Sequence, residues 1–434
     1  MVTINNIEVF DLRFPTSNEL DGSDAMNTDP DYSAAYIIIK TNKNSLEGHG
    51  HTLTMGRGND ICVKAIETLS DKLNGMDLDD IIDNNLGLYY SFIYDSQLRW
   101  LGPEKGVIHL ATAAIFNAIW DLIAKYRKKP LWKIFCEMEP RDFIKFVDFK
   151  YIEDVLSKEQ ALSILNKKFE TRSRRIETLK KSGYPAYTTS AGWLGYSEEK
   201  LKLLCKQAKN ENWRYVKFKV GLNLDDDISR LTIARKILGN DIVIMIDANQ
   251  VWNVNQAIDW VNSLKQFDPW FIEEPTSPDD ILGHLRIKER VSPIMVATGE
   301  HCQNKVMFKQ FFQSNAIDIC QLDSCRLGGI NEILAVQLLA EKFKKPICPH
   351  AGGVGLCEYV QHLAIIDYVC VSGNLEGRVL EYISHLHNNF LYPSQIKNGA
   401  YMLPEHEGYS ATVKRTSIKT FQFPNGEYWI KNKK

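Results

Sequence analysis

Strand-length apolar runs alternate with amphipathic helical segments through the second half of the chain. The runs are AYTTSAGWLG, RYVKFKVG, IVIMIDANQ, WFIEEP, PIMVATGEH, AIDICQLD, PICPHAG and YVCVS. Apolar strands separated by amphipathic helices predict a parallel sheet that is covered on both faces. Eight such units favour an α/β fold with a closed (β/α)8 TIM-type barrel over residues 186–394. An open doubly wound sheet is the alternative, but the sequence has no GxGxxG or GxxxxGK[ST] phosphate turn.

The residues before the barrel have a different pattern. TINNIEVFDLRF and SAAYIIIKT predict strands of a three-stranded sheet, and residues 60–135 have helical spacing, including the apolar segment GVIHLATAAIFNAIWDLIAKY. We therefore predict an α+β capping domain over residues 1–140. A helical linker follows over residues 141–185, where KKFETRSRRIETLKK predicts a solvated helix. We expect residues 395–434 to return to the cap.

Charge and composition narrow the classes of partner. The chain has 434 residues, 52 Lys+Arg against 54 Asp+Glu, and no basic cluster that could follow a phosphate backbone, so we expect no nucleic-acid partner. The start, MVTINNIEVFDLRFP, lacks a signal-peptide pattern, and we expect no run of membrane-spanning length, no membrane partner and a cytoplasmic location. Nine scattered cysteines without CxxC pairs predict reduced core residues.

Three acidic residues end three consecutive predicted strands. Asp247, Glu273 and Glu300 are 26 and 27 residues apart (273 − 247; 300 − 273), which is one βα unit each time. Because the carboxyl ends of parallel strands meet at one edge, these carboxylates should converge and suit a Mg²⁺ ion. Adjacent strand residues face opposite ways, so we expect Glu273 to point inward and Glu274 to be an outer or rim partner.

Basic and amide groups follow the same edge. Lys217 and Lys219, in KFK, share one face of their strand, and two adjacent cations are expected to depress each other's pKa, which would make one lysine available as a base. Asn249 lies two residues after Asp247 and could hold a substrate oxygen. Taken alone, a KxK pair is more often two solvated lysines.

The sixth and seventh units add Asp323 in QLDSCRLGG and His350 in CPHAGGVG. A carboxylate that bonds one imidazole nitrogen fixes the tautomer and leaves the other nitrogen as an acid or base. His301 follows Glu300 directly, and we assign it a rim or substrate-contact role. A lysine and a histidine that flank an ion held by carboxylates fit proton removal next to a carboxylate group.

At these residues the chain resembles the enolase superfamily, mandelate racemase subgroup. That subgroup has KxK on the second strand, three acidic Mg²⁺ ligands on the next three, and a His-Asp dyad on the seventh and sixth. The likeness is closest to the L-fuconate dehydratases, and the stretches that carry it include DAMNTDPDYSAAY, QLRWLGPEKGV, GYPAYTTSAGWLGYS and CPHAGGVGLCEYVQHL. The resemblance implies a modified, enolase-like barrel whose early cap loop closes over the mouth.

The resemblance also implies roles for individual residues. Mg²⁺, one per subunit, would be held by Asp247, Glu273 and Glu300. Lys219 would remove the 2-proton, Lys217 would act electrostatically, and His350, oriented by Asp323, would protonate the departing 3-hydroxyl of L-fuconate, giving a 2-keto-3-deoxy acid. The residues expected to contact substrate are Gly22, Ser23, Asp24, Tyr32, Lys219, Asn249, His301, His350 and Glu381.

Other functions stay open at this point. Another aldonic acid could be the substrate, because substrate choice depends on the cap loops. Lys219 and His350 could also exchange a proton at C2 without loss of water, as in a racemase or epimerase. A non-catalytic binding protein on the same scaffold is a remote alternative, which the intact set of acid, base and metal residues disfavours. The resemblance further suggests a homo-oligomer.

Overall fold

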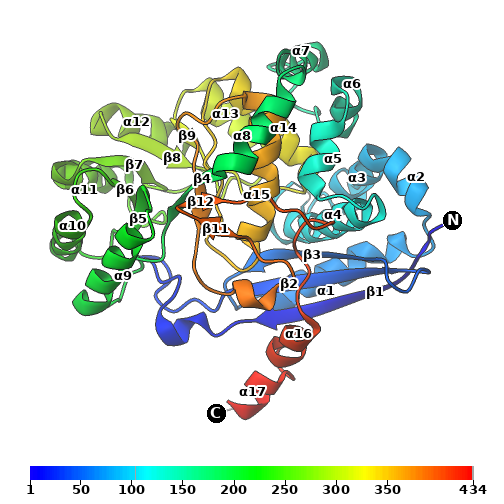
Figure 1. The fold of residues 1–434 in the computed structure, drawn as a ribbon, viewed down its shortest axis with the longest axis horizontal. Helices are drawn as coiled ribbons and strands as arrows, with labels where there is room; N and C mark the ends of the chain where they lie inside the picture. Colours follow the sequence, from blue (N-terminus) through cyan, green and yellow to red (C-terminus); the bar gives the residue numbers. More distant parts are fainter. Residues whose placement is uncertain (103, 433–434) are drawn as a thin grey trace.

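A computed structural model describes residues 1–102 and 104–432. The chain begins with the antiparallel sheet β1 (Ile4–Arg13), β2 (Ser33–Thr41) and β3 (Glu47–Thr54), in the order β1-β2-β3. This confirms the predicted three-stranded sheet. Figure 1 shows this blue sheet and its helices on one side of the barrel. The cap helices are α1 (Asn59–Ser70), α2 (Leu78–Asp83), α3 (Asn85–Ile93), α4 (Gly106–Tyr126) and α5 (Leu131–Glu137).

Helix α4 corrects one expectation. Among the described residues, it is long and apolar enough by length and composition to cross a membrane, whereas the sequence was expected to contain no run of that length. Most of the helix is buried, because it packs against β2, β3 and α1. Close packing is visible at Gly50, where a Cβ atom would lie 2.4 Å from the Ala114 carbonyl oxygen, so only glycine fits there.

Seven of the eight predicted strand positions form the parallel barrel wall. Neighbouring strands pair in chain order, and Ile347 continues the wall as a parallel bridge to Cys320. These strands are β4 (Tyr184–Thr188), β5 (Tyr215–Lys219), β6 (Val243–Asp247), β7 (Pro269–Glu273), β8 (Met295–Thr298) and β9 (Ile319–Cys320).

The prediction of an eighth strand at YVCVS is wrong. Residues Asp367–Ser372 form a π-helical segment, η6, that continues α15 (Leu356–Ile366). The eighth strand is instead β10 (Leu380–Tyr382), which pairs in parallel with β4 and so extends the barrel wall on the other side of the first strand. A short apolar run fits a buried helix as well as a strand, and here the run follows directly from a buried helix.

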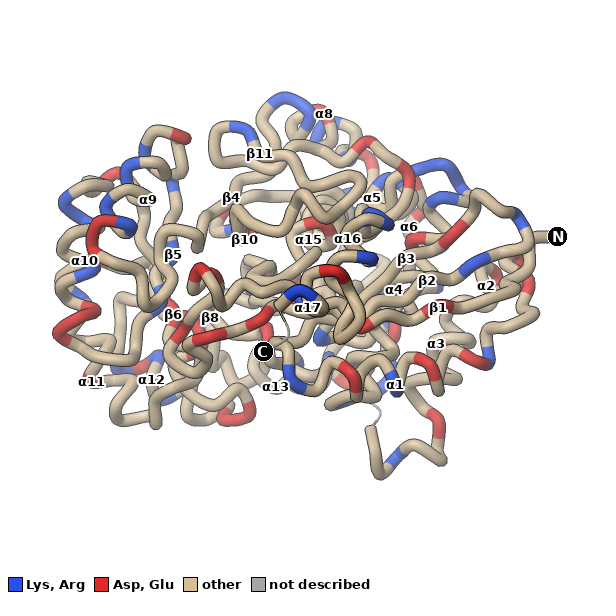
Figure 2. Tube along the Cα trace, turned by 90° about the horizontal axis from the view of Figure 1, so that it is seen from below, with Lys and Arg blue, Asp and Glu red and all other residues tan. Residues whose placement is uncertain are grey.

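Helices cover the outside of the barrel. They are α9 (Glu198–Asn210), α10 (Leu224–Leu238), α11 (Val254–Leu264), α12 (Ile281–Val291), α13 (Lys305–Gln313) and α14 (Ile330–Lys342), followed by α15. Five of them begin after a polar side chain that accepts a backbone N–H of the first turn; these caps are Ser197, Asn223, Asn253, Asp280 and Asn304. Charges of both signs are interspersed along α9 to α12 (Figure 2).

The strand period of two decides which side chains reach the barrel mouth. A cluster of buried side chains fills the barrel interior: Tyr187, Met245, Phe271, Ala297, Ile319, Cys348 and Val379. Two residues further along their strands or the loops that follow them are Asp247, Glu273, Gln321, His350 and Glu381. Because alternate residues share a face, these polar side chains lie above an apolar floor.

The remaining segments lie against both parts. The charged stretch predicted as one helix forms two, α7 (Lys158–Phe169) and α8 (Arg172–Ser182), after the short α6 (Pro140–Phe143). In the tail, β11 (Ile396–Lys397) and β12 (Ala400–Tyr401) form a hairpin that pairs with β4, while α16 (Arg415–Phe421) packs on β1 before α17 (Glu427–Lys431). All nine cysteines are free, as predicted.

Candidate active site at the barrel mouth

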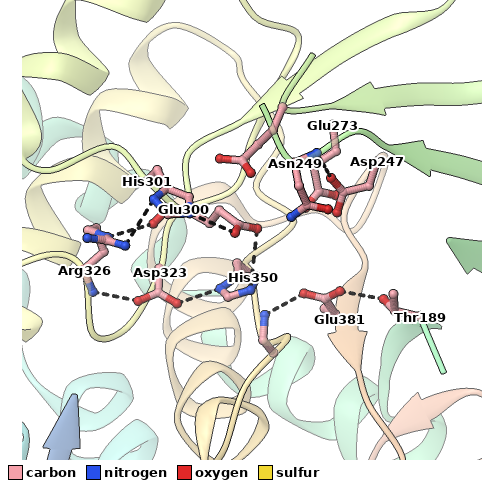
Figure 3. A network of polar contacts seen from close by, with 12 residues as sticks. Thr189, Asp247, Asn249, Glu273, Glu300, His301, Asp323, Arg326, His350 and Glu381 are labelled. Carbon is pink, nitrogen blue, oxygen red and sulfur yellow. Dashed lines mark hydrogen bonds and ion pairs between the residues drawn. The ribbon is translucent and has the colours of Figure 1, made fainter. Parts of the chain in front are cut away.

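A cavity of about 290 Å³ lies where the cap meets the carboxyl ends of the barrel strands. Both parts of the chain line it. The predicted site residues in its wall are Asp24, Tyr32, Lys219, Asn249, Glu300, His301, Asp323, His350 and Glu381. The structure therefore brings most of the predicted site to one place. Figure 3 shows the barrel groups from close by.

The two lysines of β5 are both buried and both bonded to carboxylates. Lys217 Nζ lies 2.8 Å from each oxygen of Glu273 and 2.9 Å from Glu381 Oε1. Lys219 Nζ donates to Asp247 Oδ2 at 2.6 Å and to Asn249 Oδ1 at 2.8 Å. Lys217 thus lies deeper, while Lys219 reaches the cavity.

These contacts correct the expected pKa of the lysine pair. Burial and repulsion from Lys217 both favour the neutral amine of Lys219 and lower its pKa. Asp247 and further carboxylates outweigh these two effects, so the pKa of Lys219 is raised. The pKa of Lys217 is also raised, because Glu273 and Glu381 outweigh its burial. Lys217 does lower the pKa of Lys219, as expected, but the expectation of a net depressed pKa is wrong because the carboxylates outweigh this repulsion.

The end of β5 is held by a buried arginine. Arg230, on α10, donates to the carbonyl oxygens of Lys219, Gly192 and Trp193. At Gly192 a Cβ atom would lie 2.2 Å from the Lys217 carbonyl oxygen, so the loop after β4 can approach β5 only with glycine there. This packing fixes the backbone from which Lys219 extends.

The alternation of side chains along a strand predicts the position of Glu273 but not that of Glu274. Glu273 points inward as expected, but Glu274 is also fully buried and does not lie on a rim. The backbone of Glu274 has φ 44°, in the left-handed region, and Asn249 and Gln250 have φ 45° and 68°. Conformations that bulky residues rarely adopt cluster here, which is typical of a functional site. Because the positive φ of Glu274 departs from strand geometry one residue after β7, face alternation does not predict where its side chain lies.

The carboxylates are crowded and incompletely paired. Burial, followed by repulsion from Asp247, raises the pKa of Glu273 to about 8, and burial with repulsion from Glu300 holds the pKa of Glu274 well above its usual range. Glu274 Oε1 accepts from Gln250 Nε2 at 2.9 Å, but Glu274 Oε2 and Glu300 Oε2 are buried and accept no hydrogen bond from the described residues. Unpaired buried carboxylate oxygens are costly, so this spot favours a cation.

The donor set fits a divalent metal ion. Among the described residues, one carboxylate oxygen of Glu274, one carboxylate oxygen of Glu300 and one ring nitrogen of His301 lie within 4.8 Å of one another and could hold a metal ion. Of the expected trio Asp247, Glu273 and Glu300, the first two are bonded to the lysines instead. Hard carboxylate oxygens suit Mg²⁺. The surplus of buried acidic groups would be relieved by such an ion.

The predicted dyad is present. His350 Nδ1 lies 2.8 Å from Asp323 Oδ2, and His350 Nε2 lies 3.5 Å from Glu300 Oε2 (Figure 3). Asp323 Oδ1 accepts the backbone N–H groups of Cys325 and Arg326. Burial opposes the imidazolium, but Glu300 and Asp323 outweigh it and raise the pKa of His350 to about 9. With Nδ1 occupied, Nε2 is the nitrogen available for acid–base work.

Glu381 links three neighbours. It accepts from Thr189 Oγ1 at 2.6 Å and from the Ala351 N–H at 2.8 Å, in addition to its contact with Lys217. Burial raises its pKa, but Lys217 and His350 outweigh burial and lower it. Glu381 is therefore a fixed anion in the cavity wall.

The early cap loop contributes unequally. Asp24 and Tyr32 line the cavity, whereas Gly22 and Ser23 are not in its wall. Gly22 has φ 87° and lies against the Tyr32 ring, and the Ser23 carbonyl oxygen accepts the Leu194 N–H at 3.0 Å. Gly22 and Ser23 thus hold the loop against the barrel.

Arg326 and Trp193 line the cavity and were missed by sequence reasoning. Trp193 follows the first barrel strand in AGWLG, so its position after a strand was an available signal. Arg326 donates from Nη2 to His301 Nδ1 at 3.2 Å and from Nε to the Glu300 carbonyl oxygen at 3.3 Å. No sequence signal indicates this contact, since it depends on how two loops meet.

Two family descriptions match the two parts of the chain. Residues 24–135 match the N-terminal domain of the mandelate racemase / muconate lactonizing enzyme family, and residues 200–417 match the family described as enolase C-terminal domain-like. The matches correspond to the cap and the barrel.

Two curated relatives align over almost the whole chain. Mitochondrial enolase superfamily member 1 of Xenopus laevis is 52% identical over 431 residues, which cover 99% of this chain and 97% of that protein. L-galactonate dehydratase of Hypocrea jecorina is 51% identical over 428 residues, which cover 98% of this chain and 94% of that protein.

Solved structures agree with the fold. The crystal structure of human mitochondrial enolase superfamily member 1 superposes with a TM-score of 0.97 at 50% identity, covering 99% of this chain and 98% of that one. L-talarate/galactarate dehydratase from Salmonella typhimurium LT2, liganded with Mg and L-lyxarohydroxamate, has a TM-score of 0.75 at 22% identity, covering 96% of this chain and 92% of that one. From its sequence, its barrel and these matches, the chain belongs to the enolase superfamily.

Proposed function

We propose that the protein is a Mg²⁺-dependent dehydratase of the mandelate racemase subgroup that converts an acid sugar to its 2-keto-3-deoxy acid and water. One observation carries the proposal. Glu274 and Glu300 each have a buried carboxylate oxygen that accepts no hydrogen bond from the described residues, and Glu300 shares a cavity with an amine, Lys219, and an imidazole, His350. An acid, a base and a place for a divalent cation are what removal of a proton beside a carboxylate requires.

The residues have separate tasks in this proposal. In its neutral form Lys219 accepts the 2-proton of the substrate. Asp247 is the main cause of the raised pKa of this lysine, and a cation bound by Asp247 would offset that effect. Asn249, bonded to Lys219, positions a substrate oxygen. His350 donates a proton from Nε2 to the departing 3-hydroxyl, with Asp323 holding the ring. Lys217 stays a buried cation that neutralises Glu273 and Glu381. Loss of water gives an enol, which tautomerises to the keto acid.

Asp247, Glu273 and Glu300 are our proposed ligands for one Mg²⁺ per subunit, with Glu274 buried beside them. A bound Mg²⁺ would supply positive charge to the carboxylate end of the substrate. Magnesium also appears with the Salmonella typhimurium dehydratase. Its likeness to this chain supports the fold, and the ion is carried over here as part of the proposal.

L-fuconate is the proposed substrate, and L-galactonate is the alternative. L-fuconate is 6-deoxy-L-galactonate, so the two acids share their configuration from C2 to C5. The 51% identity to an L-galactonate dehydratase therefore supports this configuration without deciding the group at C6. An apolar pocket rejects an added hydroxyl by only about 10²-fold, so we expect activity on both acids.

A screen of aldonic acids tests the proposal. Keto-acid formation is measured with Mg²⁺ and again after chelation, with L-fuconate, L-galactonate and their C2 epimers. We expect Mg²⁺-dependent keto acid from the first two. Activity that survives complete removal of metal would refute the mechanism, and activity confined to another acid would refute the substrate. Exchange at C2 without loss of water would identify a racemase or epimerase.

A further inference from the structure

His301 and Arg326 form a pair at the edge of the cavity. Arg326 Nη2 lies 3.2 Å from His301 Nδ1, and the guanidinium is held in place because Nε also donates to the Glu300 carbonyl oxygen at 3.3 Å. The Arg326 backbone N–H donates to Asp323 Oδ1 at 2.7 Å. Arg326 therefore ties the loop after β8 to the loop after β9 (Figure 3).

The chemistry of the two side chains fixes the tautomer of His301. A guanidinium carries only donors, so the ring nitrogen that faces it has to accept. Nδ1 consequently lacks a proton, and in the neutral ring the proton is on Nε2. That nitrogen lies 3.5 Å from Glu300 Oε1. The Nε2–H group thus points toward the carboxylate rather than offering a lone pair there.

This orientation matters because His301 is close enough to bind the same ion as its neighbours. One of its ring nitrogens lies within 4.8 Å of a carboxylate oxygen of Glu274 and of Glu300, and each of these carboxylates has a buried oxygen that accepts no hydrogen bond from the described residues. An imidazole ligand has to present a bare nitrogen to the metal. For Nε2 to do so, its proton would have to move to Nδ1, where it would face the Arg326 donor.

We infer that Arg326 is a positioning residue for metal selectivity: it holds His301 as the Nε2–H tautomer, keeps the imidazole out of the coordination sphere and leaves a site of oxygen ligands. Oxygen ligands suit Mg²⁺, whereas an added imidazole favours Zn²⁺ and other transition metals. His301 instead donates toward Glu300, as groups around metal ligands commonly do to orient them. This inference rests on the proposed magnesium site.

Metal affinity of matched variants tests the inference. Binding of Zn²⁺ and of Mg²⁺ is measured separately on the wild type, Arg326→Met, His301→Asn and the double variant. We expect Arg326→Met to raise the Zn²⁺ affinity relative to Mg²⁺ by about tenfold or more, since the freed imidazole can join the site. The gain should disappear in the double variant. An unchanged ratio in folded Arg326→Met, or a gain that persists without His301, would overturn the inference.

A second measurement needs no change at Arg326. In Mg²⁺-loaded wild type labelled with ¹⁵N-histidine, the His301 signals are identified by their loss in His301→Asn. We expect an unprotonated Nδ1 and a protonated Nε2; a proton on Nδ1 would overturn the inference. Failure of the proposed function is distinguishable, because it appears as absence of Mg²⁺-dependent dehydration in wild type, whatever tautomer His301 adopts.

Discussion

Two buried networks of charged groups lie on the barrel, and they differ in how completely their carboxylates are paired. The first is the cavity set described above. The second, which we call the interdomain network, consists of His109 on α4, Glu332 on α14, Lys305 on α13 and Asp148 between them. Both combine carboxylates with basic groups away from solvent.

In the interdomain network the carboxylate oxygens all have partners. Glu332 Oε1 accepts the Lys305 N–H at 2.9 Å, and Glu332 Oε2 accepts the Gly328 N–H at 2.8 Å and contacts His109 Nε2 at 2.8 Å. Asp148 Oδ2 contacts Lys305 Nζ at 2.7 Å, and Tyr90 donates to Asp148 Oδ1 at 3.2 Å.

The pKa shifts of the carboxyl groups also differ between the two networks. Burial raises the pKa of Glu332, but His109 and Lys305 outweigh it and lower the pKa to about 2, whereas the pKa of Glu274 in the cavity is raised. A network whose carboxylate oxygens are all paired stabilises the fold, and one whose carboxylates are incompletely paired is suited to a ligand. We therefore assign the interdomain network to stability and the cavity to metal and substrate.

The largest effect should follow removal of the proposed base. We expect Lys219→Ala to lower kcat by about 10³–10⁴-fold, because the 2-proton loses its acceptor. Exchange of the C2 proton with D₂O should stop while Mg²⁺ still binds. NMR of the substrate measures the exchange of the C2 proton, and calorimetric titration measures the binding of Mg²⁺. Lys202→Ala, on the exposed face of α9, is the control and should keep its activity. Continued exchange of the C2 proton in Lys219→Ala would show that Lys219 is not the base.

Breaking the interdomain network should affect stability instead. Glu332→Gln removes the buried anion beside His109, while Lys305 keeps Asp148, and we expect it to lower the free energy of unfolding by about 3 kcal/mol. Urea denaturation measures this. Glu427→Gln, which removes the charge of a solvent-exposed partner of Lys419, should leave the free energy of unfolding nearly unchanged. If Glu332→Gln were as stable as the control, the assignment of this network to stability would be wrong.

Acidification should erase the advantage of the wild type over Glu332→Gln. A carboxyl group whose pKa is lowered on folding contributes stability above its unfolded value of 4.5, and the contribution is lost as pH falls toward about 2. We expect a difference in unfolding free energy of up to about 3 kcal/mol at pH 6 that shrinks below pH 4.5. Urea titrations at several pH values report it, and a difference that grew on acidification would contradict the sign.

Much of the barrel could be predicted from sequence, because each strand and helix has a local pattern. Seven strand positions follow from apolar runs of strand length. The eighth was misplaced because β10, Leu380–Tyr382, is too short to stand out, and YVCVS nearby is more apolar. For such short apolar runs the sequence pattern does not distinguish a helix from a strand, and packing decides between them.

The sequence also predicts that most of the proposed site residues meet in one cavity, but it does not predict their partners. Lys219 was assigned a depressed pKa from Lys217 alone, whereas Asp247, 28 residues away, decides the direction. Strand alternation predicts Glu274 to be an outer or rim partner; the rim alternative is wrong, because Glu274 is buried just past the strand end, where φ turns positive. Arg326 meets His301 only through the fold, so local spacing contains no trace of the contact.

Binding of Mg²⁺ to three proteins tests the contrast between the two networks most directly. Calorimetric titration at neutral pH is carried out on the wild type, Glu300→Gln and Glu332→Gln. We predict saturable binding of one Mg²⁺ per chain in the wild type, about 10–100-fold weaker binding in Glu300→Gln, and unchanged affinity in Glu332→Gln. Equal affinity in the wild type and Glu300→Gln, or no saturable binding at all, would contradict the account.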